Sequence, residues 1–255
     1  MVGGAAPVLT RVRALGLAAL LVALALFSAF AEELPSLREG ASVAVAALVV
    51  LPAFTATIWL ALPLAARVQP MWLLAGGALA GVAWVGFYFA DIDAASNMSK
   101  LACFVLVGFW FLSLFEFLWW LGLVAVVVPW VDIWSVAFGP TKYVTEEQPG
   151  FFEDVSLALH VPGETATANI GPPDIVFFAL FLAAAQRFAL RIPATWFSMT
   201  GFLSTTLIVV WALDSSGLPA LPAVCWGFLL PNADLIWRDV RDAYAAYVAK
   251  REEAK

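Results

Sequence analysis

The chain has 255 residues and a net charge of −6; 63% of its residues are hydrophobic, only 13% are charged, and the mean hydropathy is +0.92. A soluble domain has about 45–50% apolar and about 25% charged residues, so a soluble core of this size cannot hide the excess, and lipid is the expected solvent for much of it. The charge balance provides no basic patch for nucleic acid. With two cysteines, Cys103 and Cys225, and the single histidine His160, we expect neither a metal site nor a cofactor.

Apolar runs close to the ~20 residues that a spanning helix needs predict an all-α polytopic membrane protein of one domain. The eight predicted spans are residues 14–31, 40–66, 71–90, 97–115, 117–138, 172–190, 193–213 and 218–237. The first run also resembles a signal peptide, because it follows Arg11 and Arg13 and ends in Ala29-Phe30-Ala31; its removal would leave seven spans. Glu116 is expected to mark the turn that divides the long apolar stretch 101–138 into two helices.

Two polar segments complete the chain. Residues 139–171 form the longest predicted loop, and long loops inside compact domains are often functional. Residues 238–255 form a charged tail, expected to be a short surface helix.

The distribution of lysine and arginine orients the predicted spans. With eight spans both termini lie on one side of the membrane, and ten basic residues fall on that side against three on the other. The ten are Arg11, Arg13, Arg67, Arg187, Arg191, Arg238, Arg241, Lys250, Arg251 and Lys255, and the three are Arg38, Lys100 and Lys142. We therefore expect cytoplasmic termini and an outward-facing loop 139–171.

An ionisable Asp inside a span costs at least ~2.5–3.5 kcal/mol on insertion scales. Asp91, Asp93, Asp214 and Asp234 lie at or near the ends of predicted helices, where water is within reach, and two other aspartates remain inside predicted spans. Asp132 lies about six residues before the end of its span, and Asp174 lies just inside the next span. Because these spans are consecutive and antiparallel, the two carboxyl groups are expected near the same, outward end and could meet. A carboxyl pair that shares one proton can activate water and polarise a peptide carbonyl. Depth and pairing alone are also compatible with isolated packing acids or an ion path.

Three segments, in order, resemble those of presenilins and signal peptide peptidases, the GxGD-type intramembrane aspartyl proteases. The segments are Trp130-Val131-Asp132-Ile133-Trp134-Ser135-Val136-Ala137 followed by Gly139-Pro140-Thr141-Lys142, then Gly171-Pro172-Pro173-Asp174-Ile175-Val176-Phe177-Phe178, then Pro219-Ala220-Leu221-Pro222. They are similar to the first catalytic segment, the Gly-x-Gly-Asp segment and the Pro-Ala-Leu motif of that family. The chain departs from the family in having Val131 for a tyrosine, Pro173 for the second glycine, and eight predicted spans rather than nine.

The resemblance implies a presenilin-like fold in a prokaryotic-type homologue of the plasma membrane, with Asp132 and Asp174 as the catalytic pair. It implies cleavage of transmembrane segments or signal peptides, without a cofactor. Which aspartate acts as acid and which as base stays open, because only their joint titration has meaning.

Substrate binding is expected at Gly171 and at the four residues Pro219, Ala220, Leu221 and Pro222. The two prolines disfavour regular helix, and extended backbone at membrane depth is tolerated where it lines protein or a water-filled cavity; an ordinary loop is the alternative. A transmembrane substrate must unwind, and strand addition could hold it open. Lys142, Tyr143 and Val144 are the candidate residues for such a strand.

Other functions have less support. The chain has no His-Glu-x-x-His and no Gly-x-Ser-x-Gly segment, and the Pro-Ala-Leu stretch favours presenilins over prepilin-type peptidases. A transporter or channel that uses both aspartates for ions, and a catalytically inactive scaffold of the same fold, remain alternatives. Substrate identity and oligomeric state stay open.

Overall fold

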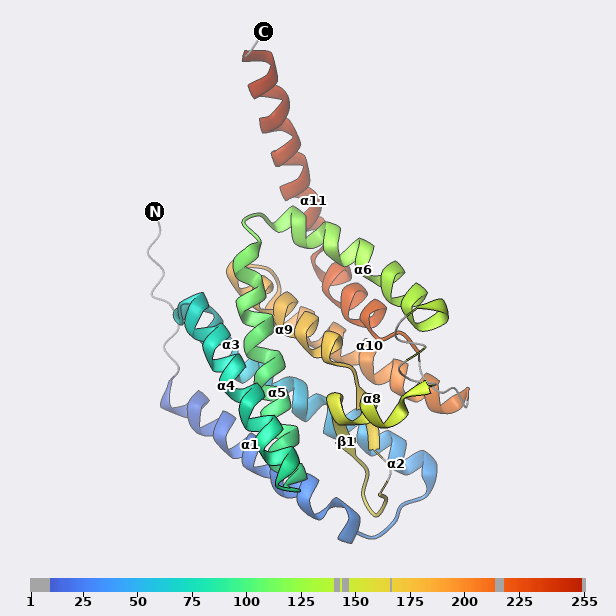
Figure 1. Ribbon diagram of the computed structural model, residues 1–255. Coiled ribbons are helices and arrows are strands. Elements are labelled where there is room, and N and C mark those ends of the chain that lie inside the picture. The colour runs from blue at the N-terminus through green and yellow to red at the C-terminus, as the bar shows by residue number, and fades with distance from the viewer. Residues whose placement is uncertain (1–9, 140–142, 144–146, 166, 214–217, 254–255) are drawn as a thin grey trace.

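The computed structural model describes residues 10–139, 143, 147–165, 167–213 and 218–253, whose regular secondary structure consists of helices and a single hairpin (Figure 1). The helices of the first half are α1 (Arg11–Phe30) with η1 (Ala31–Glu33), a continuous segment of α2 (Glu39–Val45), η2 (Ala46–Val50) and α3 (Leu51–Arg67), α4 (Pro70–Phe89), and α5 (Asp93–Phe111) with η3 (Leu112–Leu114). The second half has α6 (Leu118–Phe138), α8 (Pro149–Val155), β1 (Leu157–His160), β2 (Thr167–Ile170), α9 (Pro172–Arg187), α10 (Ile192–Ala212) and α11 (Leu221–Glu253).

The fold class is that of an α-helical integral membrane protein. Six helical segments of the described residues are long and apolar enough to cross a membrane. They are Arg11–Glu33, Glu39–Arg67, Pro70–Phe89, Asp93–Leu114, Leu118–Phe138 and Ile192–Ala212. The two other predicted spans contain α9 and the first part of α11, which are not among the six; that they also cross the membrane stays a prediction.

Proline sets several of the helix boundaries. Pro70, Pro172 and Pro193 lie in the first turns of α4, α9 and α10, where a missing N–H has no cost because the first helical N–H groups lack intrahelical partners. Glu116 is exposed and lies in the turn between η3 and α6, where the sequence placed it.

Helix α9 lies at the centre of the protein and packs against α3, α5, α10 and α11. Its residues from Phe178 to Ala185 are all buried, as expected for a helix that is apolar on every side. The approach of α5 is close: a Cβ at Gly108 would lie 2.5 Å from the Val176 carbonyl oxygen. On the α11 side, the Phe181 and Phe228 rings stack with centroids 4.5 Å apart. Because protein surrounds α9, this helix needs little lipid-facing surface.

Segment 139–171 is more ordered than the predicted loop, since it contains α8 and the antiparallel hairpin. The strands pair from Leu157↔Ile170 to His160↔Thr167. The Asn97 side chain of α5 donates to the Ala158 carbonyl (2.8 Å) and accepts from the Ala158 N–H (2.9 Å). These bonds pair both backbone groups of Ala158 on the edge of β1, so the hairpin is docked on α5. Strand β2 then leads directly to Gly171 and α9.

The C-terminal segment differs from the expected separate surface helix. Helix α11 is continuous to Glu253, and its last turns project away from the other helices (Figure 1). The predicted extended stretch is also shorter than expected: backbone outside the helix ends at Ala220, and Leu221 and Pro222 belong to the first turn of α11. Proline is compatible with a first turn, which is why Pro222 did not exclude helix there.

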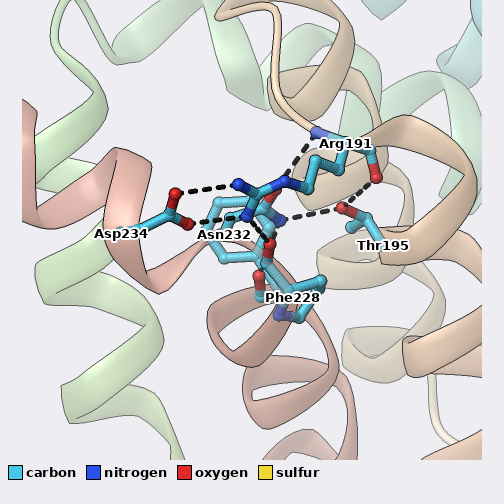
Figure 2. Close-up of polar contacts among 6 residues, drawn as sticks. Arg191, Thr195, Phe228, Asn232 and Asp234 are labelled. Atoms are coloured by element: carbon cyan, nitrogen blue, oxygen red, sulfur yellow. Dashed lines mark hydrogen bonds and ion pairs between the residues drawn. The ribbon is translucent and has the colours of Figure 1, made fainter.

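A polar cluster ties the turn between α9 and α10 to the middle of α11 (Figure 2). Arg191 forms a two-pronged ion pair with Asp234 at 2.6 and 2.8 Å, and its backbone N–H donates to the buried Asn232 (3.1 Å). The Asn232 amide donates in turn to Thr195 Oγ1 and to the Phe228 carbonyl, both at 2.8 Å. The cluster holds α11 next to Pro231, where the helical hydrogen-bond pattern is interrupted.

Candidate active site

The site is formed where α6, α9 and the start of α11 meet. Asp132 comes from α6 and Asp174 from the first turn of α9, and both side chains are half-buried. The two carboxyl groups are close enough to interact electrostatically. The fold therefore brings together two acids that are 42 positions apart in the chain (174 minus 132).

Leu221 connects the third segment to this pair. Its backbone N–H donates to Asp132 Oδ2 at 3.1 Å. Leu221 is the first residue of α11, so its N–H has no partner within the helix and is available to the carboxylate. The positive end of the α11 dipole faces the same group.

Asp174 is held by the residue that precedes its own helix. It is the third residue of α9, and its carboxylate is hydrogen-bonded by the backbone of Gly171, the N-cap residue. This contact is one half of a capping box. A Cβ at Gly171 would lie only 3.1 Å from Asp174 Oδ2, so glycine leaves the space that the carboxylate occupies. The same contact would also be made if Asp174 served only to cap α9 and took no part in a reaction.

The remaining predicted residues lie at various distances from this pair. Pro219 and Ala220 are half-buried immediately before α11, and the Ala220 carbonyl accepts from the Ala223 and Val224 N–H groups, which makes Ala220 the start of the helix. Tyr143 is 58% exposed. Lys142 and Val144 lie outside the described residues, and the strand expected at 142–144 stays a prediction.

Cys225 is a neighbour of the pair that sequence reasoning took for a small buried hydrophobe. It is fully buried and interacts electrostatically with both Asp132 and Asp174. The sequence signal for this position is its spacing: Cys225 follows Leu221 by four residues, which places both on the same face of a helix.

Within the described ranges, no group of three or more His, Cys, Asp or Glu side chains is placed to hold a metal ion. The fold and the site define an integral membrane protein with two neighbouring carboxyl groups, one within α6 and one in the first turn of α9, beside the start of α11. Comparisons with protein-family models, curated proteins and solved structures identified no match for the chain.

Proposed function

We propose that the protein is an intramembrane aspartyl endopeptidase of the presenilin and signal peptide peptidase type, which cleaves within or near transmembrane segments or signal peptides. The observation that supports this most directly is that Asp132 and Asp174 lie within electrostatic range of each other, with the Leu221 N–H bonded to Asp132. The three segments that resemble the family are far apart in the sequence, and each contributes one of these groups.

In the proposed reaction, the two carboxyl groups share one proton, because like charges at close range cannot both ionise cheaply. The ionised carboxylate takes a proton from a water molecule, whose oxygen attacks the peptide carbonyl carbon. The protonated carboxyl group donates its proton to the carbonyl oxygen. When the C–N bond breaks, the leaving nitrogen takes up the proton from one carboxyl group. As the C=O bond re-forms, a hydroxyl group of the tetrahedral intermediate gives its proton to the other carboxylate, and the pair again holds one proton. The N–H groups of Leu221 and Gly171 keep the carboxylates in position.

The hairpin offers a route for the substrate. Strand β2 ends at Ile170, Gly171 follows directly, and Asp174 lies three residues after Gly171. Because Asn97 occupies the outer edge of β1, an unwound peptide would join the edge of β2, where backbone hydrogen bonds hold it extended. Such a peptide would run towards the two carboxyl groups. Lys142, Tyr143 and Val144 remain the other candidate strand.

The test is cleavage of a generic transmembrane peptide by the purified full-length protein in liposomes. Asp132→Asn and Asp174→Asn should each abolish cleavage, and the double variant should be no worse than either single one, because the pair acts as a unit. Glu116→Gln is the matched control. It also removes one carboxylate, but Glu116 lies before α6, whose first residue is about 21 Å of helix away from Asp132 at 1.5 Å per residue, so normal activity is expected.

Two results would contradict the proposal. An Asp174→Asn variant that cleaves normally would remove Asp174 from the reaction. Proton or cation flux that depends on both aspartates, without any peptide cleavage by the unmodified chain, would instead establish a transporter or channel.

A further inference from the structure

A cavity of about 420 Å³ lies at the opposite end of α9 from Asp174. It is formed where the C-terminal ends of α3, α9 and the α5–η3 segment meet the first turn of α4. Gln186, in its wall, is 12 residues after Asp174 (186 minus 174), or about 18 Å along the helix. The cavity is therefore separate from the candidate active site.

The wall of the cavity is mostly apolar, with three polar side chains: Ser113, Gln186 and Arg187. The Gln186 Oε1 atom is buried and accepts no hydrogen bond from any described group. Buried polar atoms in folded proteins are nearly always paired, and leaving an acceptor unpaired is costly. The wall thus presents an acceptor that requires a donor from a molecule inside the cavity.

Arg187 adds a positive charge next to this acceptor. Its Nη1 atom donates to the Leu112 carbonyl at 3.0 Å, while the side chain stays exposed. A guanidinium carries five N–H donors and favours phosphate and carboxylate partners. One donor is used by Leu112, so Arg187 can also bind an anionic group at the cavity.

The surroundings indicate that the cavity lies at the level of lipid headgroups. Trp72, in the first turn of α4 beside the cavity residue Pro70, is 69% exposed. Exposed tryptophans at the ends of spanning helices are typical of the membrane–water interface. The apolar walls, which include Val68, Leu73 and Phe109, suit the carbon skeleton of a lipid below its headgroup.

We propose that this cavity binds the headgroup of a phospholipid whose phosphate contacts Arg187 and whose terminal hydroxyl or ammonium group donates to Gln186 Oε1. Phosphatidylethanolamine and phosphatidylglycerol have both groups. Phosphatidylcholine has the phosphate but no donor hydrogen on its headgroup, so it cannot satisfy Gln186. The inference does not depend on the proposed protease activity.

The experiment measures binding of dioleoyl phosphatidylethanolamine, phosphatidylglycerol and phosphatidylcholine to the delipidated full-length protein in detergent, by native mass spectrometry and by the shift in unfolding temperature. Phosphatidylethanolamine and phosphatidylcholine have the same net charge, so their comparison isolates the donor. We expect phosphatidylethanolamine and phosphatidylglycerol to bind about tenfold more tightly than phosphatidylcholine, the effect of one hydrogen bond to a buried acceptor. Glycerol 3-phosphate, which lacks acyl chains, should not bind measurably.

Two variants assign the effect to the cavity. Gln186→Leu should abolish the preference over phosphatidylcholine and should fold at least as well as the unmodified chain, because it removes an unpaired acceptor. Arg187→Gln should weaken all three lipids about tenfold, the loss of one charge-assisted phosphate contact. Arg241→Gln removes an exposed charge from α11, outside the cavity, and should leave binding unchanged.

Equal binding of the three lipids would overturn the proposal, and so would a preference that survives in a folded Gln186→Leu protein. Binding of glycerol 3-phosphate as tight as that of the lipids would assign the cavity to a soluble phosphate compound instead.

Discussion

At the scale of single residues, the candidate site depends on backbone N–H groups at the starts of two helices. Leu221 donates to Asp132 from the start of α11, and Gly171 holds Asp174 from the cap of α9. Pro172 and Pro173 have no N–H to offer, so Gly171 is the nearest donor ahead of Asp174 in the chain. The departure from the family pattern at Pro173 thus leaves the capping contact intact.

Gly171→Ala tests whether the position of the Asp174 carboxylate matters. The new Cβ would lie 3.1 Å from Asp174 Oδ2, so the carboxylate must shift, while the φ of −62° at Gly171 suits alanine. Peptide cleavage should fall by about tenfold to a hundredfold, because small misplacements of reacting groups are costly. The melting temperature should change little. Gly150→Ala is the control, because its new Cβ would have no atom within 4 Å. Equal cleavage activity of the two variants would contradict the prediction that a Cβ at position 171 displaces the Asp174 carboxylate.

At the scale of elements, the hairpin is the feature that couples the polar segment to the helices. Leu157 and Leu159 of β1 are fully buried, Asn97 pairs with the Ala158 backbone, and the buried Lys100 donates to the Ser156 carbonyl at 3.0 Å. On the edge that faces α5, β1 therefore has few solvent-exposed backbone groups. Segments with few such groups resist local unfolding. A stable β1 fixes β2, and β2 fixes the start of α9.

His160, the last residue of β1, should make the hairpin sensitive to acid. Burial lowers the pKa of His160 below its ordinary value of 6.5, against the smaller opposing effects of Asp93 and Glu32, and its Nδ1 has no partner among the described groups. A lowered pKa means that the unfolded chain binds a proton first. Stability is therefore full above about pH 6.5 and decreases as the pH falls towards the folded pKa.

The measurement is the melting temperature between pH 7.5 and pH 5, in the unmodified chain and in His160→Gln, which cannot titrate. The unmodified chain should lose more stability across this window. If the melting temperature of the two proteins depends on pH in the same way, His160 binds protons equally well in the folded and the unfolded chain, which contradicts the prediction.

At the scale of the whole molecule, the excess of arginine and lysine on the side of the termini predicts the orientation in the membrane. A cysteine at Gly150 in α8 should react with an impermeant thiol reagent in intact cells, and one at Tyr247 in α11 should react only after lysis. Both positions are exposed, so burial does not distinguish them. The native cysteines are half-buried or buried and give the background in the unmodified chain. The opposite labelling pattern would reverse the orientation.

The sequence by itself determined the membrane class and the approximate positions of the helices. Both follow from local properties: transfer into lipid depends on the composition of about 20 consecutive residues, and proline acts on its own turn of helix. The sequence also singled out Asp132, Asp174 and the Pro219–Pro222 stretch, through their depth in apolar runs and their order along the chain.

Only the tertiary structure decided how these residues meet. The Leu221–Asp132 bond joins residues 89 positions apart, and the Asn97–Ala158 pair joins residues 61 apart. No local pattern encodes such contacts, because they depend on how α5, α6, α9 and α11 pack. The same holds for Cys225 beside the carboxyl pair and for the cavity at Gln186, since each is formed by side chains from several helices. Local composition therefore specifies the elements, whereas packing between distant helices creates both sites.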